Sequence, residues 1–235
     1  MKLFIQQTKT FQLPGIDKDV LWDLFVLSFW FALRISETAN LCFSNVHIHP
    51  ATPTLPERIS ICVVDSKTNN LETPCHMVLL NAISEPEWKE FCPARAFKRL
   101  LKHKNPSQQH LFAKTDGKPI TTKFLSKSFS TFAKHFRTQH PTMFVPSDKL
   151  TFHVFHISAI GFFIRDMGFT LYEAQTVSRH KIGSATTEKI YLAKSRQSFN
   201  NSLTAKIQEY VVKHDEPPVA TDESDDCFFT QKPSP

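Results

Sequence analysis

The feature of this 235-residue chain that most restricts its fold is an apolar segment at residues 19–33. The segment is rich in Leu, Phe and Trp, and residues 24–33 carry no charged side chain. A helix that spans a bilayer needs about 20 apolar residues, and this run is shorter, with Asp19 and Asp23 at its start. The segment therefore predicts a helix buried in a protein core rather than a membrane span.

The remainder of the sequence predicts further helices and one β-hairpin. Arg58–Val64 is rich in β-branched residues, and Thr73–Leu80 is a second, weaker strand candidate, with turn-forming residues between them. Helices are expected at Glu37–Phe43 behind an N-cap at Ser36, at Pro93–Lys102, after Thr121 or Thr122, from His153 to Gly168, after Thr170, at Thr186–Lys194 and after Ser198. The predicted fold class is mainly α with a small antiparallel β-sheet (α+β).

Charge is distributed unevenly along the chain. The stretch from Asp215 to the end holds six acids and one base, so residues 1–214 carry 27 bases and 16 acids, a net charge of +11. A basic body followed by an acidic tail favours a polyanionic partner such as nucleic acid. Pro, Ser and acidic residues dominate residues 214–235, which are expected to form a disordered tail.

Cysteine and histidine usage bears on compartment and metal binding. Five cysteines are scattered along the chain with no CxxC pair, which argues against a zinc ribbon. The N-terminus lacks the features of a signal peptide, so we expect an intracellular protein with reduced thiols, nuclear if the host is a eukaryote. His47 and His49 have strand spacing and His153 and His156 helical spacing, but no further ligands lie at a recognisable distance. We expect neither a metal nor another cofactor.

Five short patterns follow one another along the chain. They are Leu33-Arg34-Ile35-Ser36-Glu37, Ser66-Lys67-Thr68 in the predicted hairpin, Cys92-Pro93-Ala94-Arg95-Ala96, His153-Val154-Phe155-His156, and Thr186–Tyr191 preceded by His180. In this order they resemble the catalytic domain of the tyrosine recombinases, the phage-integrase family, whose fold is like that of type IB topoisomerases. The third pattern, followed by Leu111-Phe112 and residues 116–121, is similar to the eukaryotic branch found in DIRS-like and Crypton mobile elements.

The resemblance implies catalytic roles for individual residues. Tyr191 matches the nucleophile, which attacks a DNA phosphodiester and forms a 3′-phosphotyrosyl link that stores the bond energy for rejoining. Arg34 matches the first phosphate-binding arginine, and Lys67 matches the general acid that protonates the leaving 5′ oxygen. His153 and His180 match two positions at which a histidine binds a phosphate oxygen or exchanges a proton with the tyrosine.

Three features depart from the family pattern. The His-x-x-Arg box of the family ends in His156 here, and a histidine has no bidentate fork. Losing one preorganised charge at such a site costs about 10²–10³ in rate, so we expect weakened strand cleavage. His180 and Tyr191 are eleven positions apart, a longer spacing than the family's. Residues 1–18 precede the expected catalytic domain at 19–213, and we expect no separate core-binding domain in them.

Three functions are open at this point. The first is a DNA strand-exchange enzyme that assembles as a homotetramer on double-stranded DNA, as the resemblance implies. The second is a domesticated DNA-binding relic of a mobile-element recombinase that has lost catalysis, and His156 is the residue that separates it from the first. The third is a partner-binding protein that keeps the scaffold without contacting DNA, and the +11 body argues against it.

DNA binding should depend strongly on salt, because a basic body displaces counterions from the phosphates that it contacts. Contacts with about 6–10 phosphates would lower the affinity by about 10³–10⁵ between about 50 and 200 mM salt. Removal of residues 215–235 should raise the affinity, since the acidic tail competes for the same surface. Fluorescence anisotropy with a labelled duplex measures both effects, and binding that ignores salt would contradict a phosphate-contacting surface.

Overall fold

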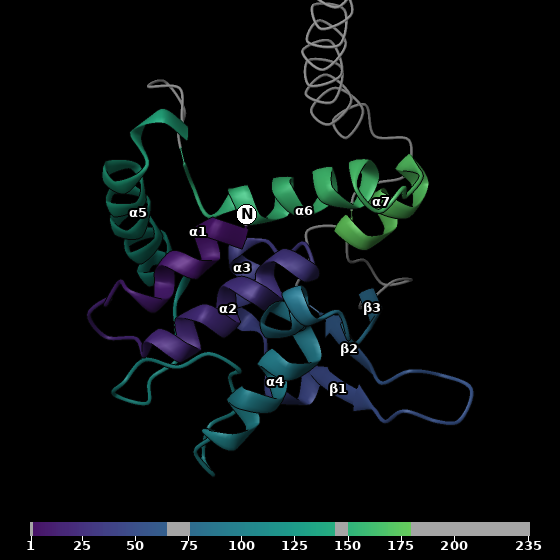
Figure 1. The fold of residues 1–235 in the computed structure, drawn as a ribbon. Coiled ribbons are helices and arrows are strands. Elements are labelled where there is room, and N and C mark those ends of the chain that lie inside the picture. Colours follow the sequence, from purple (N-terminus) through teal and green to yellow (C-terminus); the bar gives the residue numbers. More distant parts are fainter. Residues whose placement is uncertain (1, 65–75, 144–149, 180–235) are drawn as a thin grey trace, which may run out of the picture. The chain divides into compact units, whose positions relative to one another are not determined.

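The computed structural model describes residues 2–64, 76–143 and 150–179. All of them belong to the first of the two units into which the chain divides, residues 1–193 and 194–235. The described residues form the following helices and strands (Figure 1): α1 (Lys2–Gln6), α2 (Lys18–Trp30), α3 (Ile35–Asn40), β1 (Val46–His49), β2 (Arg58–Val63), β3 (His76–Asn81), α4 (Pro93–Lys102), α5 (Thr122–Gln139), α6 (His153–Arg165) and α7 (Leu171–Ser178).

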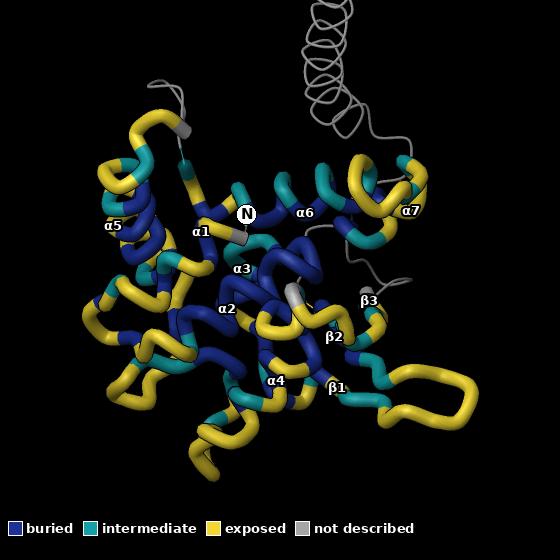
Figure 2. Tube along the Cα trace, viewed as in Figure 1, coloured by how far each residue is buried: buried dark blue, intermediate teal, exposed yellow. Residues whose placement is uncertain are grey.

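Helix α2 is the element around which the others pack. Its N-terminus is capped by Asp17, whose carboxylate accepts a hydrogen bond from the Asp19 N–H at 2.8 Å. Every residue from Leu21 to Trp30 is buried, as the continuous dark blue of this helix in Figure 2 shows. Helices α1, α4 and α6 all contact it. The buried helix predicted at residues 19–33 is confirmed, although it ends at Trp30.

The end of α2 is a left-handed turn. The Leu33 N–H donates to the Ser28 carbonyl at 2.9 Å. The Ala32 N–H donates to the Phe29 carbonyl at 3.0 Å, and the two bonds together form a Schellman cap. Ala32 has a φ of 45°, a conformation that glycine adopts more readily. The turn therefore ends α2 before residue 33, the end expected from the sequence, and separates Arg34 from the helix.

Phenylalanine rings fill the space between α1, α2, α5 and α6. Neighbouring centroids lie 4.6–6.4 Å apart in a connected cluster made of Phe4, Phe25, Phe129, Phe132, Phe136, Phe152 and Phe155. Edge-on and offset ring pairs stabilise a core beyond the area that they bury. Phe4 belongs to α1, which the sequence analysis did not predict, so residues before position 19 contribute to this core.

The three strands form one antiparallel sheet in the order β1-β2-β3. The β2–β3 register pairs Ile59 with Leu80 and Ile61 with Val78, which brings apolar side chains together on one face. The predicted hairpin is therefore confirmed, and β1 adds a third strand to it. The fold class, mainly α with a small antiparallel sheet, is confirmed as well.

Local sequence signals place several helix ends correctly. Helix α4 begins at Pro93, where the absent N–H costs nothing. Thr121 caps α5 by accepting from the Phe124 N–H at 3.2 Å. Thr170 and Glu173 form the expected capping box at the start of α7, with hydrogen bonds of 2.8 and 3.2 Å in the two directions. These three predictions are confirmed.

Phe132→Ala should lower the free energy of unfolding by about 3–5 kcal/mol, because the ring is fully buried among other phenylalanines and its loss leaves a cavity. Leu101→Ala is the control, since Leu101 is 44% exposed on α4, and it should change the value by no more than about 0.5 kcal/mol. Urea denaturation measures both. Equal losses in the two variants would show that the phenylalanine cluster does not stabilise the fold.

Candidate functional site

Arg34 lies at the N-cap of α3, the position that the sequence analysis wrongly gave to Ser36. Its backbone N–H donates to Glu37 Oε2 at 2.8 Å, and its guanidinium Nη1 donates to Glu37 Oε1 at 2.8 Å. Nη2 also donates to the main-chain carbonyl of Arg179 at 3.5 Å. The Arg34 side chain remains 17% exposed, so the guanidinium is held on its protein side and still reaches the surface.

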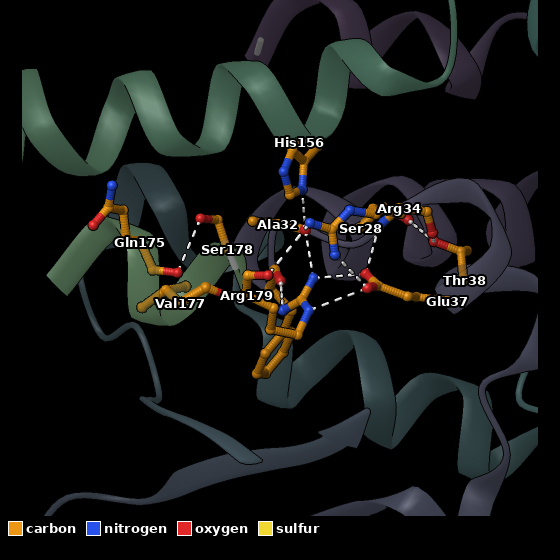
Figure 3. A network of polar contacts seen from close by, with 11 residues as sticks. Ser28, Ala32, Arg34, Glu37, Thr38, His156, Gln175, Val177, Ser178 and Arg179 are labelled. Carbon is orange, nitrogen blue, oxygen red and sulfur yellow. Dashed lines mark hydrogen bonds and ion pairs between the residues drawn. The ribbon is translucent and has the colours of Figure 1, made fainter. Parts of the chain in front are cut away.

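Arg179, at the C-terminus of α7, brings a second guanidinium to the same carboxylate. Its side chain is fully buried, and it donates to Glu37 from Nη2 at 2.7 Å and from Nε at 3.3 Å. Its other contacts are with main-chain carbonyls: Phe31 at 3.0 Å, Ala32 at 2.7 Å and Val177 at 2.8 Å. Figure 3 shows these bonds joining the end of α7 to the α2–α3 turn.

The Glu37 carboxylate is almost fully buried between the two guanidiniums. Burial by itself would raise its pKa, but the charges and hydrogen bonds of Arg179 and Arg34 outweigh burial and lower the pKa to about 2. Burial also lowers the pKa of Arg179, against the pull of Glu37, but an arginine stays charged in proteins. These three side chains therefore carry two positive charges and one negative charge at neutral pH.

His156 is fully buried in α6, and its Nδ1 lies 2.5 Å from the carbonyl oxygen of Ala32. A carbonyl can only accept, so Nδ1 carries the proton in this contact. The same oxygen accepts from Arg179 Nη2 at 2.7 Å. The imidazole and the buried guanidinium thus converge on one atom of the α2–α3 turn (Figure 3).

His153 lies one helical turn before His156, at the first position of α6, and is exposed. The two imidazole rings are stacked, with centroids 5.0 Å apart and planes inclined by 21°. Partial desolvation, and then the positive charge of Arg34, lower the pKa of His153 below its usual value. At neutral pH this imidazole is therefore uncharged and can both donate and accept a hydrogen bond.

Two residues other than glycine have a positive φ in the described part of the chain, and both belong to this network. They are Ala32, at 45°, and Arg179, at 57°. Left-handed backbone costs a non-glycine residue about 1–2 kcal/mol, and such strain clusters at functional sites. The contact from the Arg179 guanidinium to the Ala32 carbonyl joins the two strained positions.

Of the six residues predicted for the site, the structure brings Arg34, His153 and His156 together at the α2–α3 turn. The other three, Lys67, His180 and Tyr191, lie outside the described residues. Within residues 2–64, 76–143 and 150–179, no group of His, Cys, Asp or Glu side chains could hold a metal ion. None of the helices described there is both long and apolar enough to cross a bilayer.

Sequence comparisons return no family model and no curated protein that matches this chain. Solved structures do match. The Tn1549 transposon integrase in complex with circular intermediate DNA aligns with a TM-score of 0.55 and 17% identity, over 81% of this chain and 58% of the integrase. The XerH site-specific recombinase, in a post-cleavage complex with a palindromic difH substrate, aligns with a TM-score of 0.59 and 14% identity, over 86% of this chain and 50% of XerH.

A lambda integrase dimer bound to a COC′ core site also matches, with a TM-score of 0.54 and 13% identity, over 81% of this chain and 56% of the integrase. These structural neighbours are tyrosine recombinases. The chain has the fold of a tyrosine recombinase catalytic domain. It spans roughly half the length of the solved structures that it matches.

The residues that hold Arg34 in place were not predicted from the sequence. Glu37 lies three residues after Arg34, a spacing at which a helical acid can reach back to the N-cap, so its role had a local signal. Arg179 had none, because its partner carboxylate is 142 positions away in the sequence. Only the packing of α7 near α3 reveals that pair.

Glu37→Gln should lower the free energy of unfolding by about 3 kcal/mol at pH 7, since the carboxylate gains about that much from a pKa of about 2 against 4.5. A lowered folded-state pKa contributes stability above pH 4.5 that is lost as the pH falls toward 2, so the variant should lose less stability than the unmodified chain over that interval. Urea denaturation between pH 7 and 2.5 measures this. The exposed Glu85→Gln is the control, and an equal effect there would contradict the role of Glu37.

Proposed function

We propose that this chain is a DNA-binding catalytic domain of a site-specific tyrosine recombinase, acting on double-stranded DNA through a 3′-phosphotyrosyl intermediate. The observation that supports the proposal most is the setting of Arg34. Its guanidinium is fixed by Glu37, remains partly exposed and lies close enough to His153 to lower the pKa of that imidazole. A fixed guanidinium beside a neutral imidazole suits a phosphorane-like transition state, whose non-bridging oxygens gather negative charge.

The proposed reaction assigns one step to each residue. The Tyr191 hydroxyl attacks the phosphorus, and Arg34 binds the non-bridging oxygens as charge develops on them. Lys67 gives a proton to the leaving 5′ oxygen, while His153 and His180 hydrogen-bond the phosphate or take the tyrosine proton. Rejoining reverses these steps with a second strand, so the covalent link supplies the energy and no cofactor is required. The resemblance to DIRS-like and Crypton elements, and assembly as a homotetramer on DNA, belong to the same proposal.

The setting of His156 favours a second candidate, a DNA-binding relic without catalysis. The imidazole is fully buried and its Nδ1 is hydrogen-bonded to the Ala32 carbonyl. In this arrangement it offers little to a phosphate at the surface. The phosphate would then meet one exposed guanidinium, that of Arg34, where two are expected from the resemblance. In either case DNA remains the proposed partner, because the body of the chain is strongly basic.

Covalent trapping separates the two candidates. The full chain is mixed with a pool of nicked suicide duplexes of randomised core sequence, and protein–DNA adducts are separated on a denaturing gel. The recombinase proposal expects an adduct that Tyr191→Phe abolishes, because only the phenolic oxygen can bond to phosphorus. Tyr172→Phe is the matched control, since Tyr172 is 60% exposed on α7, and it should leave the adduct unchanged.

Two outcomes would change the conclusion. An adduct that persists in Tyr191→Phe would place the nucleophile elsewhere. No adduct at any duplex, together with salt-dependent DNA binding, would favour the relic.

A further inference from the structure

Positions 156 and 179 meet at one atom, the carbonyl oxygen of Ala32. His156 Nδ1 approaches it to 2.5 Å from α6, and Arg179 Nη2 approaches it to 2.7 Å from the end of α7. We propose that the side chains at these two positions compete for one buried site that accepts a single cation. In this chain the Arg179 guanidinium occupies that site, and Arg179 thereby acts as a positioning residue for Arg34. The inference deepens the proposed function and rests on it for the role of Arg34.

The contacts of Arg179 lead directly to Arg34. Arg179 binds both oxygens of the Glu37 carboxylate, and that carboxylate binds the backbone N–H and the guanidinium of Arg34. The Arg179 carbonyl also accepts from Arg34 Nη2 at 3.5 Å. Rotation of the carboxylate would break its bonds to both guanidiniums, so the buried guanidinium of Arg179 fixes the orientation of the partly exposed one of Arg34.

The charge balance of the site disfavours arginines at positions 156 and 179 at the same time. The carboxylate to which Arg179 is bonded is that of Glu37, and it also binds the guanidinium of Arg34. An arginine at position 156 would start from a fully buried side chain beside the same carbonyl, so it would add a third positive charge to that carboxylate. Burying a charge without a partner is strongly destabilising. A histidine that is protonated on Nδ1 alone would instead satisfy the carbonyl without adding a charge.

The backbone conformation at position 179 also supports a role for the Arg179 side chain. Arg179 has a φ of 57°, where a glycine or asparagine would be favoured as the residue that ends a helix. The main chain therefore does not select an arginine here. The contacts of the guanidinium with Glu37, Phe31 and Ala32 offset the strain. These contacts, and not the backbone conformation, therefore account for an arginine at position 179.

A double-mutant cycle tests, without any assay of activity, whether positions 156 and 179 share one buried cation site. The unmodified chain, His156→Arg, Arg179→Gly and the double variant are compared by thermal melting of the full chain. His156→Arg alone should lower the melting temperature by about 10 °C, as expected for an unpaired buried charge. In the Arg179→Gly background the same substitution should raise the melting temperature, because the new guanidinium then has Glu37 as its partner.

Two further variants keep this cycle decisive. Arg179→Lys retains the charge but loses the fork, so its melting temperature should lie between those of the unmodified chain and Arg179→Gly. Arg165→Gln is the matched control, because Arg165 is exposed on α6 and its guanidinium binds the Gly161 carbonyl of the same helix, so melting should hardly change. If Arg179→Gly alone fails to fold, recovery of a cooperative melt in the double variant supports the proposal. Equal effects of His156→Arg in both backgrounds, or a double variant that fails to fold, would overturn it.

Single-turnover trapping on the duplex pool then tests the positioning of Arg34. Arg179→Gly should slow adduct formation by about 10²-fold, the cost of a misplaced catalytic group, while the affinity for the duplex is kept. The double variant should recover much of that rate. A parallel loss of affinity and rate would mean that Arg179 supports the fold alone, which contradicts a positioning role. If the unmodified chain forms no adduct, the proposed function fails, and the melting cycle still decides whether the two positions share one cation.

Discussion

The buried ion pair between Glu37 and Arg179 is the interaction on which the site depends. It joins the start of α3 to the end of α7, two segments separated by most of the chain. The Glu37 carboxylate also fixes Arg34, and the Arg179 guanidinium also binds the carbonyls of Phe31 and Ala32, which directly follow α2. A buried pair with good geometry and satisfied N–H groups specifies one arrangement, because any other leaves a charge without a partner.

The surrounding core gives this network a rigid support. Helix α2 is buried from Leu21 to Trp30, and α1, α4 and α6 pack against it. The phenylalanine cluster places Phe155 of α6 4.6 Å from Phe25 of α2, centroid to centroid, which sets the position of α6 one residue before His156. Close packing of this kind transmits strain rather than absorbing it, so the left-handed residues Ala32 and Arg179 can be held at the site.

The arrangement also explains how a chain with so little sequence similarity to known recombinases can share their fold. Identities of 13–17% leave most contacts to be made by different residues. In this chain a short turn follows the buried helix α2, Arg34 lies at the start of α3, and α6, which carries His153 and His156, packs against α2. Arg179 at the C-terminus of α7 binds the Glu37 carboxylate, which in turn binds Arg34, and the function proposed for the site rests on the exposure that Arg34 retains.

Local structure could be predicted from the residues alone. The uncharged run indicated the buried helix, the β-branched residues indicated the hairpin, and Pro93, Thr121 and Thr170 marked the starts of α4, α5 and α7. It also singled out Arg34, His153 and His156, because their order along the chain resembles a known pattern. The residues that surround these three side chains became known only from the packing of distant helices. The end of α2 at Trp30 depends on a turn stabilised by other helices, and the pairing of Glu37 with Arg179 depends on burial, where a charge must find its partner however distant in sequence.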